Sequence, residues 1–512
     1  MAHAEYTSLL HRTIDRRRTS FAFRCLTGMS LFAIKPFDTL CEESGGTAQS
    51  HTLRRALGPL SLIGLGIGAI IGAGLFSLTG IAAAENAGPA VVLSFVVAAI
   101  GCAFAGMCYS ELASMIPVAG SAYTYAYATM GEFVAWIIGW DLVLEYAVGA
   151  ATVSVSWSRY VVSLLHEWGL NLPAQLTISP FDTAKLADGT EVQGFVNLPA
   201  IFVIAVISLL LMRGISESAK VNNTIVVIKL AVVAAVIGVG AFYVKSQNYV
   251  PFIPPNTGNF GEFGFSGIMR GAGVIFFAYI GFDAVSTAAQ EAKNPQRDMI
   301  WGILGSLAIC TVLYVCFALV LTGMVNYQAM RGDAAPVATA IDMTPFKWLQ
   351  VAVKLGIICG FTTVILVMLL GQSRVFYAMS HDGLLPRVFS RLHETWQTPW
   401  RSNAIFMVFT GALAGLVPIS SLGHMTSIGT LLAFVIVCAG VVVLRRTQPQ
   451  QKRSYRVPLS PLFPALGILV CLAMMVSLDI ATWIRLAVWL VIGLAIYFGY
   501  GRRHSKVARQ ES

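Results

Sequence analysis

The sequence predicts an all-α polytopic membrane protein with about twelve transmembrane helices. Three observations support this fold class. The 512-residue chain is 56% hydrophobic and only 12% charged, whereas soluble domains carry about 25% charged residues. Its apolar residues fall in runs of roughly 20, the length that crosses the hydrocarbon core of a bilayer. These runs recur from residue 60 to residue 500 without a long polar interruption, so one membrane domain with short loops is expected.

Each apolar run defines one expected span, and the basic residues give the orientation. The spans are expected at residues 60–84, 88–116, 132–165, 197–213, 217–244, 267–290, 298–324, 347–379, 402–418, 424–444, 461–477 and 481–500. Alternate loops carry the basic residues, for example Arg213 with Lys220 and Arg445 with Arg446. By the positive-inside rule these loops and both termini are cytoplasmic, as expected for a multi-pass protein of the cell membrane. The net charge of +9 therefore reflects topology, and we expect no nucleic-acid partner.

Other classes of protein lack support in the motifs. Seven of the nine cysteines lie inside apolar runs without C-x-x-C spacing, so we expect neither disulfides nor a metal site. An intramembrane hydrolase would need a nucleophile with its base, or an H-E-x-x-H motif, and the sequence shows neither. We therefore expect a protein that is not an enzyme and that holds no metal or organic cofactor.

Glycines distinguish the first and sixth spans from the others. The first contains Gly64, Gly66, Gly68, Gly72 and Gly74, and the sixth contains Gly267, Gly271, Gly273 and Gly281. Paired glycine-interrupted spans in successive five-helix blocks indicate an inverted-repeat transporter with broken helices. The amides and carbonyls freed at such breaks suit the carboxylate and ammonium of a zwitterion. In the alternative interpretation, the G-x-x-x-G steps of the first span only allow two helices to approach closely.

Several motifs, in a fixed order, carry a resemblance to a known family. They are residues 66–76 (GIGAIIGAGLF), 120–125 (GSAYTY), 139–146 (GWDLVLEY), 276–283 (FFAYIGFD), 291–297 (EAKNPQR), 371–374 (GQSR) and 382–386 (DGLLP). Together they resemble the amino acid-polyamine-organocation superfamily over about residues 29–500, and within it bacterial members of the cationic amino acid transporter family. The resemblance implies a five-plus-five inverted-repeat core with helices 1 and 6 broken, two peripheral helices, and proton-linked uptake of an L-amino acid.

The same resemblance divides the chain into parts. It implies an N-terminal extension at 1–55, a first repeat at 56–246, a second repeat at 247–446, two further spans at 447–500 and a cytoplasmic tail at 501–512. The family-like sequence begins near Met29, and the preceding residues are basic and unpatterned. Residues 1–28 are therefore predicted to be dispensable. The oligomeric state is left open.

The resemblance also assigns substrate-binding residues. It places the substrate's amino and carboxylate groups against Ile70, Ile71, Gly72, Ala73 and Gly74 on the first helix and against Phe277, Ala278 and Ile280 on the sixth. Met368 on the eighth span is expected to line the side-chain end of the pocket. A bulky methionine leaves room for a short side chain, so small neutral amino acids such as alanine are the expected substrates. The alternatives are a cationic substrate, an exchanger, or a nutrient sensor that shares the fold.

Lys229 lies deep in an apolar run, about a dozen residues into the fifth span. Intramembrane ionisable groups are costly and are functional candidates, and burial disfavours the charged ammonium, so that protonation can switch. The resemblance places Lys229 behind the broken first helix, where sodium-coupled relatives bind their ion. The proton is therefore the expected coupling ion, and a sodium site at Thr362 and Thr363 is the minority view. Alternatively, Lys229 is a structural ammonium bound to backbone carbonyls.

Glu145 lies at the centre of the third span, with Asp141 one turn towards the cytoplasm. Three interpretations of Glu145 remain open: a second proton site, a partner for a cationic substrate side chain, or a protonated acid satisfied by a neighbouring helix. Four other charged residues fall near expected cytoplasmic helix ends, where solvated interface charges are expected and gate salt bridges are the alternative. They are Glu111, Asp283, Glu291 and Arg297.

Overall fold

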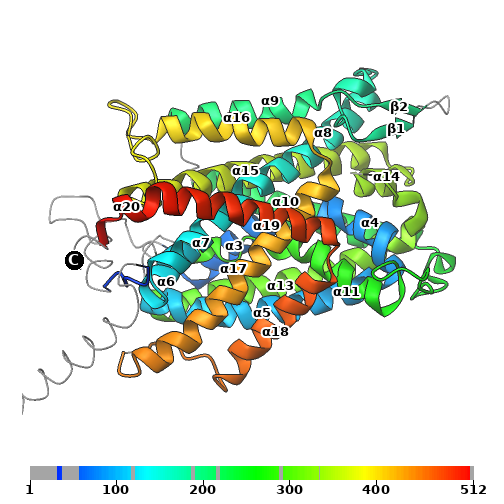
Figure 1. Ribbon diagram of the computed structural model, residues 1–512. Helices are drawn as coiled ribbons and strands as arrows, with labels where there is room; N and C mark the ends of the chain where they lie inside the picture. The colour runs from blue at the N-terminus through cyan, green and yellow to red at the C-terminus, as the bar shows by residue number, and fades with distance from the viewer. Residues whose placement is uncertain are drawn as a thin grey trace, which may run out of the picture.

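The computed structural model describes most of the chain as one helical bundle. The described residues are 31–36, 57–116, 121–185, 191–214, 219–287, 292–333, 335–451 and 453–507. The long helices run beside one another, with the C-terminal end of the chain at one end of the bundle and the strands β1 and β2 at the other (Figure 1). Residues 1–28, which the sequence predicts to be dispensable, lie outside the described residues.

The first five expected spans form the first part of the bundle. Span 1 consists of α3 (Pro59–Ile70), η1 (Gly74–Leu78), α4 (Thr79–Ala82) and η2 (Ala83–Ala87), and span 2 consists of η3 (Gly88–Ala90) and α5 (Val91–Met115). Span 3 consists of α7 (Glu132–Val143), η4 (Leu144–Val148) and α8 (Gly149–Glu167). Spans 4 and 5 are α9 (Leu198–Met212) and α10 (Ala219–Gly240). Between spans 2 and 3 lies α6 (Ser121–Thr129), which the span pattern did not predict.

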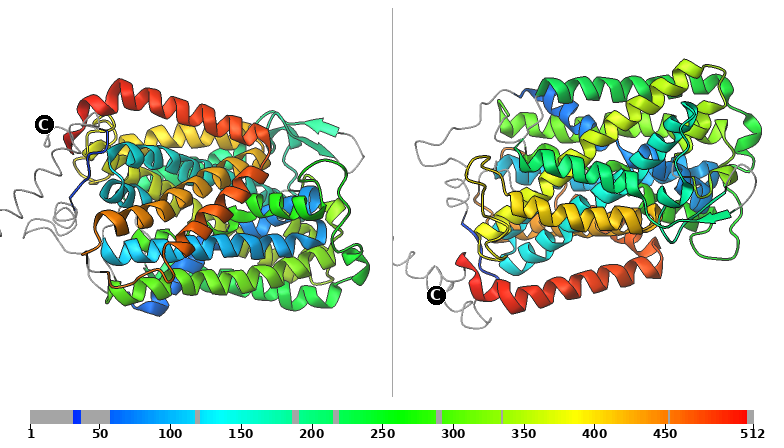
Figure 2. Two further views of the ribbon diagram at one scale, coloured as in Figure 1. Left: turned by 60° about the horizontal axis from the view of Figure 1, so that its bottom comes forward. Right: turned by 90° about the horizontal axis from the view of Figure 1, so that it is seen from above.

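The other seven expected spans follow along the chain. Span 6 is α11 (Gly264–Ile275) with η8 (Phe276–Tyr279) and α12 (Ala284–Thr287), span 7 is α13 (Pro295–Met324), and span 8 is α15 (Lys347–His381). Spans 9 and 10 are α16 (Trp400–Leu416) and α17 (Ile419–Thr447). Span 11 is α18 (Leu462–Ser477), and span 12 is α19 (Ile480–Ile496) with η11 (Tyr497–Gly501) and α20 (Arg502–His504). In both turned views α19 lies along the outside of the bundle (Figure 2). Its side chains Ile484, Val488 and Val491 are exposed, as suits contact with lipid.

The loops at the end of the bundle that carries β1 and β2 also contain short elements. These are η5 (Ala174–Leu176), the antiparallel strands β1 (Thr183–Lys185) and β2 (Glu191–Gln193), η6 (Ala241–Tyr243), η7 (Ser246–Tyr249), η10 (Tyr327–Met330) and α14 (Pro336–Asp342). The buried Lys354 of α15 forms ion pairs with Glu167 and with Asp342, the last residue of α14. These ion pairs fasten α14 to the ends of α8 and α15.

Each of the twelve expected spans coincides with a helix or with consecutive helical segments. Within the described residues, seven continuous helical stretches are long and apolar enough to cross a membrane, and α3, α9 and α18 are shorter apolar helices. The predicted fold class, an all-α polytopic membrane protein, is thereby confirmed. Spans 1 and 6 are the interrupted ones, as the glycine pattern indicates.

An N-terminal segment, residues 31–36, is bound to the bundle and is called the strap below. The amide N–H groups of Phe133 and Glu132 donate to the carbonyls of Leu31 and Ala33, at 2.9 and 3.0 Å. The Lys35 ammonium is buried and donates to Asp382 Oδ1 at 2.8 Å. The strap therefore joins the start of α7 to the loop that follows α15.

The C-terminal segment binds to the same region. The Lys506 amide donates to the Asp382 carbonyl at 3.0 Å, and the Tyr123 hydroxyl of α6 donates to Asp382 Oδ2 at 2.7 Å. Ser505 and Tyr497 donate to the buried carboxylate of Glu132. Asp382 and Glu132 thus bind segments from both ends of the described chain.

Candidate functional site

The two interrupted helices are unwound at mid-bundle. In span 1, α3 ends at Ile70, and Ile71 has an extended backbone with ψ of 106° before helical structure resumes at Gly74. In span 6, η8 ends at Tyr279 and is followed by Gly281 with φ of +117°. Helix ends leave backbone N–H and C=O groups without intrahelical partners, so both breaks provide free polar groups inside an apolar bundle.

The two breaks contact each other through two glycines. A Cβ atom added at Gly74 would lie 2.2 Å from Ala278 Cα, and one added at Gly281 would lie 2.7 Å from the Ala69 carbonyl oxygen. Each break therefore packs its glycine against backbone of the other helix. This reciprocal contact fixes the unwound segments side by side.

Two glycines of span 6, Gly267 and Gly271, have a different role from the one expected. A Cβ at Gly267 would lie 2.1 Å from the Asn86 carbonyl oxygen, and one at Gly271 would lie 2.8 Å from Ser94 Oγ. These glycines lie within the intact helix α11 and allow close packing, so the expectation that they weaken it is wrong. Gly64 has no atom within 4 Å of such a Cβ, which removes it from the proposed G-x-x-x-G contact.

Lys229 joins α10 to the break in span 1. Its side chain is buried, and its Nζ donates to the Gly68 carbonyl at 2.6 Å. Its methylene groups lie against Gly360 of α15, where an added Cβ would be 2.9 Å from Lys229 Cε. The position behind the broken first helix is the predicted one. A proton-coupling lysine and a structural ammonium would both make this carbonyl contact.

The two threonines considered for sodium lie on α15 near this lysine. Thr362 Oγ1 donates to the Ile358 carbonyl at 2.8 Å, and Thr363 Oγ1 donates to the Gly360 carbonyl at 2.9 Å. Both hydroxyl protons are thus directed at their own helix. The Thr362 oxygen also accepts from Trp157 Nε1 at 3.1 Å. Each hydroxyl oxygen still has a lone pair, so the sodium interpretation stays a prediction.

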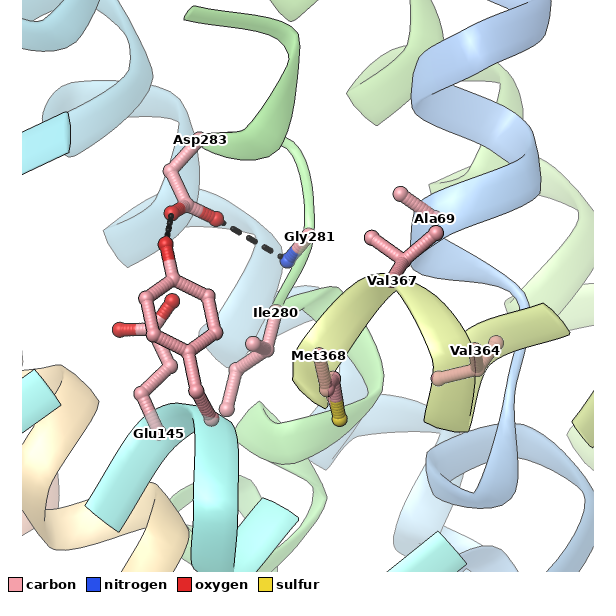
Figure 3. A pocket seen from close by; sticks show the side chains of 9 residues that line it. Ala69, Glu145, Ile280, Gly281, Asp283, Val364, Val367 and Met368 are labelled. Carbon is pink, nitrogen blue, oxygen red and sulfur yellow. Dashed lines mark hydrogen bonds between the residues drawn. The ribbon is translucent and has the colours of Figure 1, made fainter. Parts of the chain in front are cut away.

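A small pocket lies between spans 1, 3, 6 and 8 (Figure 3). Its lining residues are Ala69, Glu145, Tyr146, Ile280, Gly281, Asp283, Val364, Val367 and Met368. The cavity measures about 20 Å³, enough for roughly one water molecule. The structure therefore shows the pocket nearly closed, and an amino acid could enter it only after the surrounding helices separate.

Three of the residues predicted from the sequence line this pocket: Glu145, Ile280 and Met368. The other predicted binding residues lie in the unwound segments or directly beside them and are not among the lining residues: Ile70, Ile71, Gly72, Ala73, Gly74, Phe277 and Ala278. All of them are buried. Lys229 contacts span 1 from its other side, through Gly68.

Asp283 is a pocket residue, which corrects the expectation of a solvated interface charge. Its side chain is only 3% exposed. Its Oδ1 accepts from the Gly281 amide at 3.2 Å, and its Oδ2 accepts from the Tyr146 hydroxyl at 3.4 Å (Figure 3). Sequence spacing placed Asp283 near a helix end, but the unwound segment before it returns the carboxyl group to the pocket. Asp283 therefore holds the break in span 6.

Glu145 is directed into the same pocket from η4 (Figure 3). Both of its carboxyl oxygens are buried without a hydrogen-bond partner among the described residues, and the same is true of Asp141 one turn away. The carboxyl group nevertheless lies beside Asp283 and beside Thr430 of α17, so the interpretation in which a neighbouring helix satisfies Glu145 stays open. A buried polar group without a partner is costly and commonly marks a functional site.

Glu111 also differs from expectation. It is fully buried, and Arg445 Nη2 and Arg453 Nε lie 2.5 and 3.3 Å from its carboxylate oxygens. The Val457 amide donates to the same carboxylate at 2.7 Å. Glu111 thus ties α5 to the segment after α17 and is not a solvated charge. Arg297 is exposed, as expected, and Glu291 lies outside the described residues.

The sequence is similar to those of known permeases and transporters. A family model described as amino acid permease matches residues 57–497. The branched-chain amino acid permease BcaP of Bacillus subtilis (strain 168) is 44% identical over 478 residues, covering 93% of this chain and 99% of that protein. The methylthioribose transporter of the same organism is 42% identical over 477 residues, with the same coverage. The chloroplastic cationic amino acid transporter 9 of Arabidopsis thaliana is 38% identical over 412 residues, covering 80% of this chain and 69% of that protein.

The matched region contains both broken helices, Lys229 and every residue that lines the pocket. The superfamily resemblance carried by the sequence motifs is thereby confirmed. These relatives are named as permeases and transporters, in agreement with the expectation that the chain is not an enzyme. The chain belongs to the amino acid permease family, and it is a multi-pass membrane transporter of amino acids.

Proposed function

We propose that this transporter takes up small neutral amino acids together with protons by alternating access. The observation that carries the proposal is the bond from Lys229 Nζ to the Gly68 carbonyl, behind the break in span 1. A single titratable group in an apolar helix touches the backbone that would form the substrate site. Its protonation and the shape of that site are therefore coupled.

The substrate's charged ends suit the two breaks. The outer half of span 1 begins near Gly74, where the Leu75 and Phe76 amides donate to the Gly72 carbonyl at 3.2 Å, and the positive end of the helix dipole there attracts a carboxylate. The last carbonyls of α3 and the carbonyls of Phe277 and Ala278 are acceptors for an ammonium. The substrate side chain would then extend towards Val364, Val367 and Met368, which form the apolar wall of the pocket (Figure 3).

Lys229 would switch this site. The charged ammonium donates strongly to the Gly68 carbonyl and holds the end of α3, whereas the neutral amine donates more weakly. Proton loss on the cytoplasmic side would loosen the site and release the substrate. Because the ammonium supplies the positive charge that sodium brings in other transporters, the proposal requires a proton gradient and no sodium. Glu145 and Asp283 would provide a second proton site at the pocket.

Branched-chain amino acids are the second candidate substrates. The apolar wall of the pocket accepts a hydrocarbon side chain, and the 44% identical relative is named for branched-chain amino acids. The two candidates differ in the volume that Met368 must leave free.

Uptake of labelled substrates into proteoliposomes with an imposed pH gradient tests the proposal. We expect alanine uptake driven by external acid and independent of sodium. Uptake of leucine in preference to alanine would favour the second candidate, and uptake of methylthioribose with no amino acid would reject both. Uptake that follows sodium and ignores pH would reject the role of Lys229.

Met368→Ser should widen the range of substrates. Met368 is 7% exposed, and its sulfur lies 3.2 Å from where a Cβ on Gly149 would be, so the side chain fills the space between α15 and α8. Shortening it removes about two methylene-sized groups, and we expect leucine and methionine uptake to rise about tenfold relative to alanine. The measurement is competition of unlabelled amino acids against labelled alanine. Wild-type protein that takes up arginine as well as alanine would contradict the size argument.

The orientation proposed from the basic loops places the strap in the cytoplasm, and it predicts a sharp truncation boundary. Removal of residues 1–28 leaves the strap intact and should leave uptake unchanged. Removal of residues 1–36 also removes the Lys35 partner of Asp382 and should lower uptake several-fold, because breaking a buried pair leaves an uncompensated charge. Both truncated proteins are compared with Lys35→Ala at equal membrane expression. Loss of uptake in the shorter truncation would contradict the prediction that residues 1–28 are dispensable.

A further inference from the structure

Tyr314 connects the two breaks from a third helix. It lies in the middle of α13 and is fully buried. Its hydroxyl oxygen is 3.0 Å from the Ile70 carbonyl oxygen and 2.9 Å from the Ala278 carbonyl oxygen. A tyrosine hydroxyl has a single proton to donate. That one proton is therefore shared between the end of α3 and η8.

We propose that Tyr314 is a positioning residue for the amino acid substrate, because its hydroxyl sets the two unwound segments in register. This inference rests on the proposed function, in which the substrate's ammonium binds at these carbonyls. It adds a residue on a helix that has no part in the pocket lining.

The contacts explain why a shared donor suits this place. Ile70 is the last residue of α3, so its carbonyl has no intrahelical donor. Without substrate, the Tyr314 hydroxyl satisfies this carbonyl in part. When an ammonium donates to the Ile70 carbonyl, the Tyr314 hydroxyl can direct its hydrogen bond entirely to the Ala278 carbonyl. The Ile70 and Ala278 carbonyls would thus each keep a donor in both the empty and the loaded site.

Lys229 and Tyr314 act on neighbouring groups of span 1. Lys229 binds the Gly68 carbonyl from α10, and Tyr314 binds the Ile70 carbonyl from α13. The final turn of α3 is therefore held from two helices. Tyr314 extends this hold to span 6, because its hydroxyl also reaches the Ala278 carbonyl.

The Tyr314 ring is fixed by its aromatic neighbours, which supply a matched control. Its centroid lies 5.5 Å from that of Phe95 and 5.4 Å from that of Tyr279. The Tyr279 hydroxyl donates to the Phe95 carbonyl of α5, at 3.0 Å. Tyr279→Phe therefore removes a buried hydroxyl from the same cluster without removing a bond that joins the two breaks.

The experiment compares Tyr314→Phe and Tyr279→Phe in the full-length chain, reconstituted into proteoliposomes. Initial rates of uptake under a fixed pH gradient are measured against alanine concentration, and Tm is measured with and without alanine. We expect Tyr314→Phe to raise KM about tenfold, since an unpaired buried carbonyl weakens the site. Its maximal rate should stay within about twofold of wild type, and alanine should raise its Tm less than that of wild type. Tyr279→Phe should lower Tm while KM stays unchanged.

Several results would overturn the inference. An unchanged KM in Tyr314→Phe, or an equal rise in both variants, would show that the hydroxyl does not position the substrate. Failure of Tyr314→Phe alone to fold would assign the hydroxyl to stability. If wild-type protein takes up leucine in place of alanine, the comparison is made with leucine. If the wild-type protein takes up no amino acid, the proposed function itself fails. This outcome differs from a failure of the inference about Tyr314, in which the wild type transports normally.

Discussion

Lys229→Ala should abolish pH-driven accumulation of substrate while the protein still folds and reaches the membrane. The substitution removes the side chain that the proposed mechanism protonates behind the break in span 1, together with its hydrogen bond of 2.6 Å to the Gly68 carbonyl. Counterflow of substrate without a gradient should persist at a reduced rate, because the remaining backbone groups of the site are intact. The measurement is accumulation in proteoliposomes with an acidic exterior, with and without sodium.

Two further variants separate the charge of Lys229 from its position. Lys229→Arg keeps a cation that does not release its proton, so accumulation should again be lost. Gly360→Ala leaves the lysine in place but would set a methyl group 2.9 Å from its Cε, which displaces the ammonium. It should weaken pH coupling, whereas Gly238→Ala on the lysine's own helix meets nothing within 4 Å and should not. An alanine variant at Lys229 that remains fully coupled would reject the role.

Gly74→Ala should reduce uptake to a few per cent of wild type or less. The added methyl group would lie 2.2 Å from Ala278 Cα and 2.5 Å from the Ala278 nitrogen, which are backbone atoms that cannot rotate away. Overpacking of a core costs about 1–3 kcal/mol and more where backbone must shift. The two breaks would separate, and the substrate groups that they share would lose their geometry. Initial uptake rates at equal reconstituted protein are the measurement.

The matched control for Gly74 lies on the same span. Gly64→Ala adds the same methyl group where no atom is within 4 Å, and it should leave uptake unchanged. Gly281→Ala should behave like Gly74→Ala, because φ of +117° is strained for alanine and the Ala69 carbonyl oxygen is 2.7 Å away. Equal uptake by Gly74→Ala and wild type would show that the close contact of the breaks is not needed for transport.

Hydropathy was sufficient to predict the spans because each is a local property of about 20 residues. The breaks were assigned to the correct helices, but most of the glycines used for that assignment serve packing. Gly267 and Gly271 face Asn86 and Ser94, which are partners that no local pattern reveals. A glycine needed for a close approach and one needed for an unwound backbone look the same in a sequence. Among the glycines named for spans 1 and 6, only Gly281 has a positive φ, which marks it as a glycine that the unwound backbone requires.

The site was predictable where a residue is unusual for its surroundings. Lys229 and Glu145 are charged residues in the middle of apolar runs, and both lie at the breaks or the pocket. Asp283 was misjudged because its place near the end of an apolar run hides the turn that brings it back. Tyr314 lies at mid-span, far from the interface where tyrosines anchor helices, and that position was the available signal. The strap could not be predicted, because its partner Asp382 is 347 residues from Lys35.

That separation sets an order of events during biosynthesis. The ribosome adds about 5–20 residues per second, so a strap that binds Asp382 must wait roughly 20–70 seconds after Lys35 emerges. Glu132 waits longer still for Ser505, which is 373 residues further along the chain. The nascent chain therefore exposes these charges until eight spans, and then all twelve, have entered the bilayer. Closure of this end of the bundle would therefore mark the joining of segments from both ends of the described chain, which gives quality-control proteases a distinction between a partly assembled bundle and an assembled one.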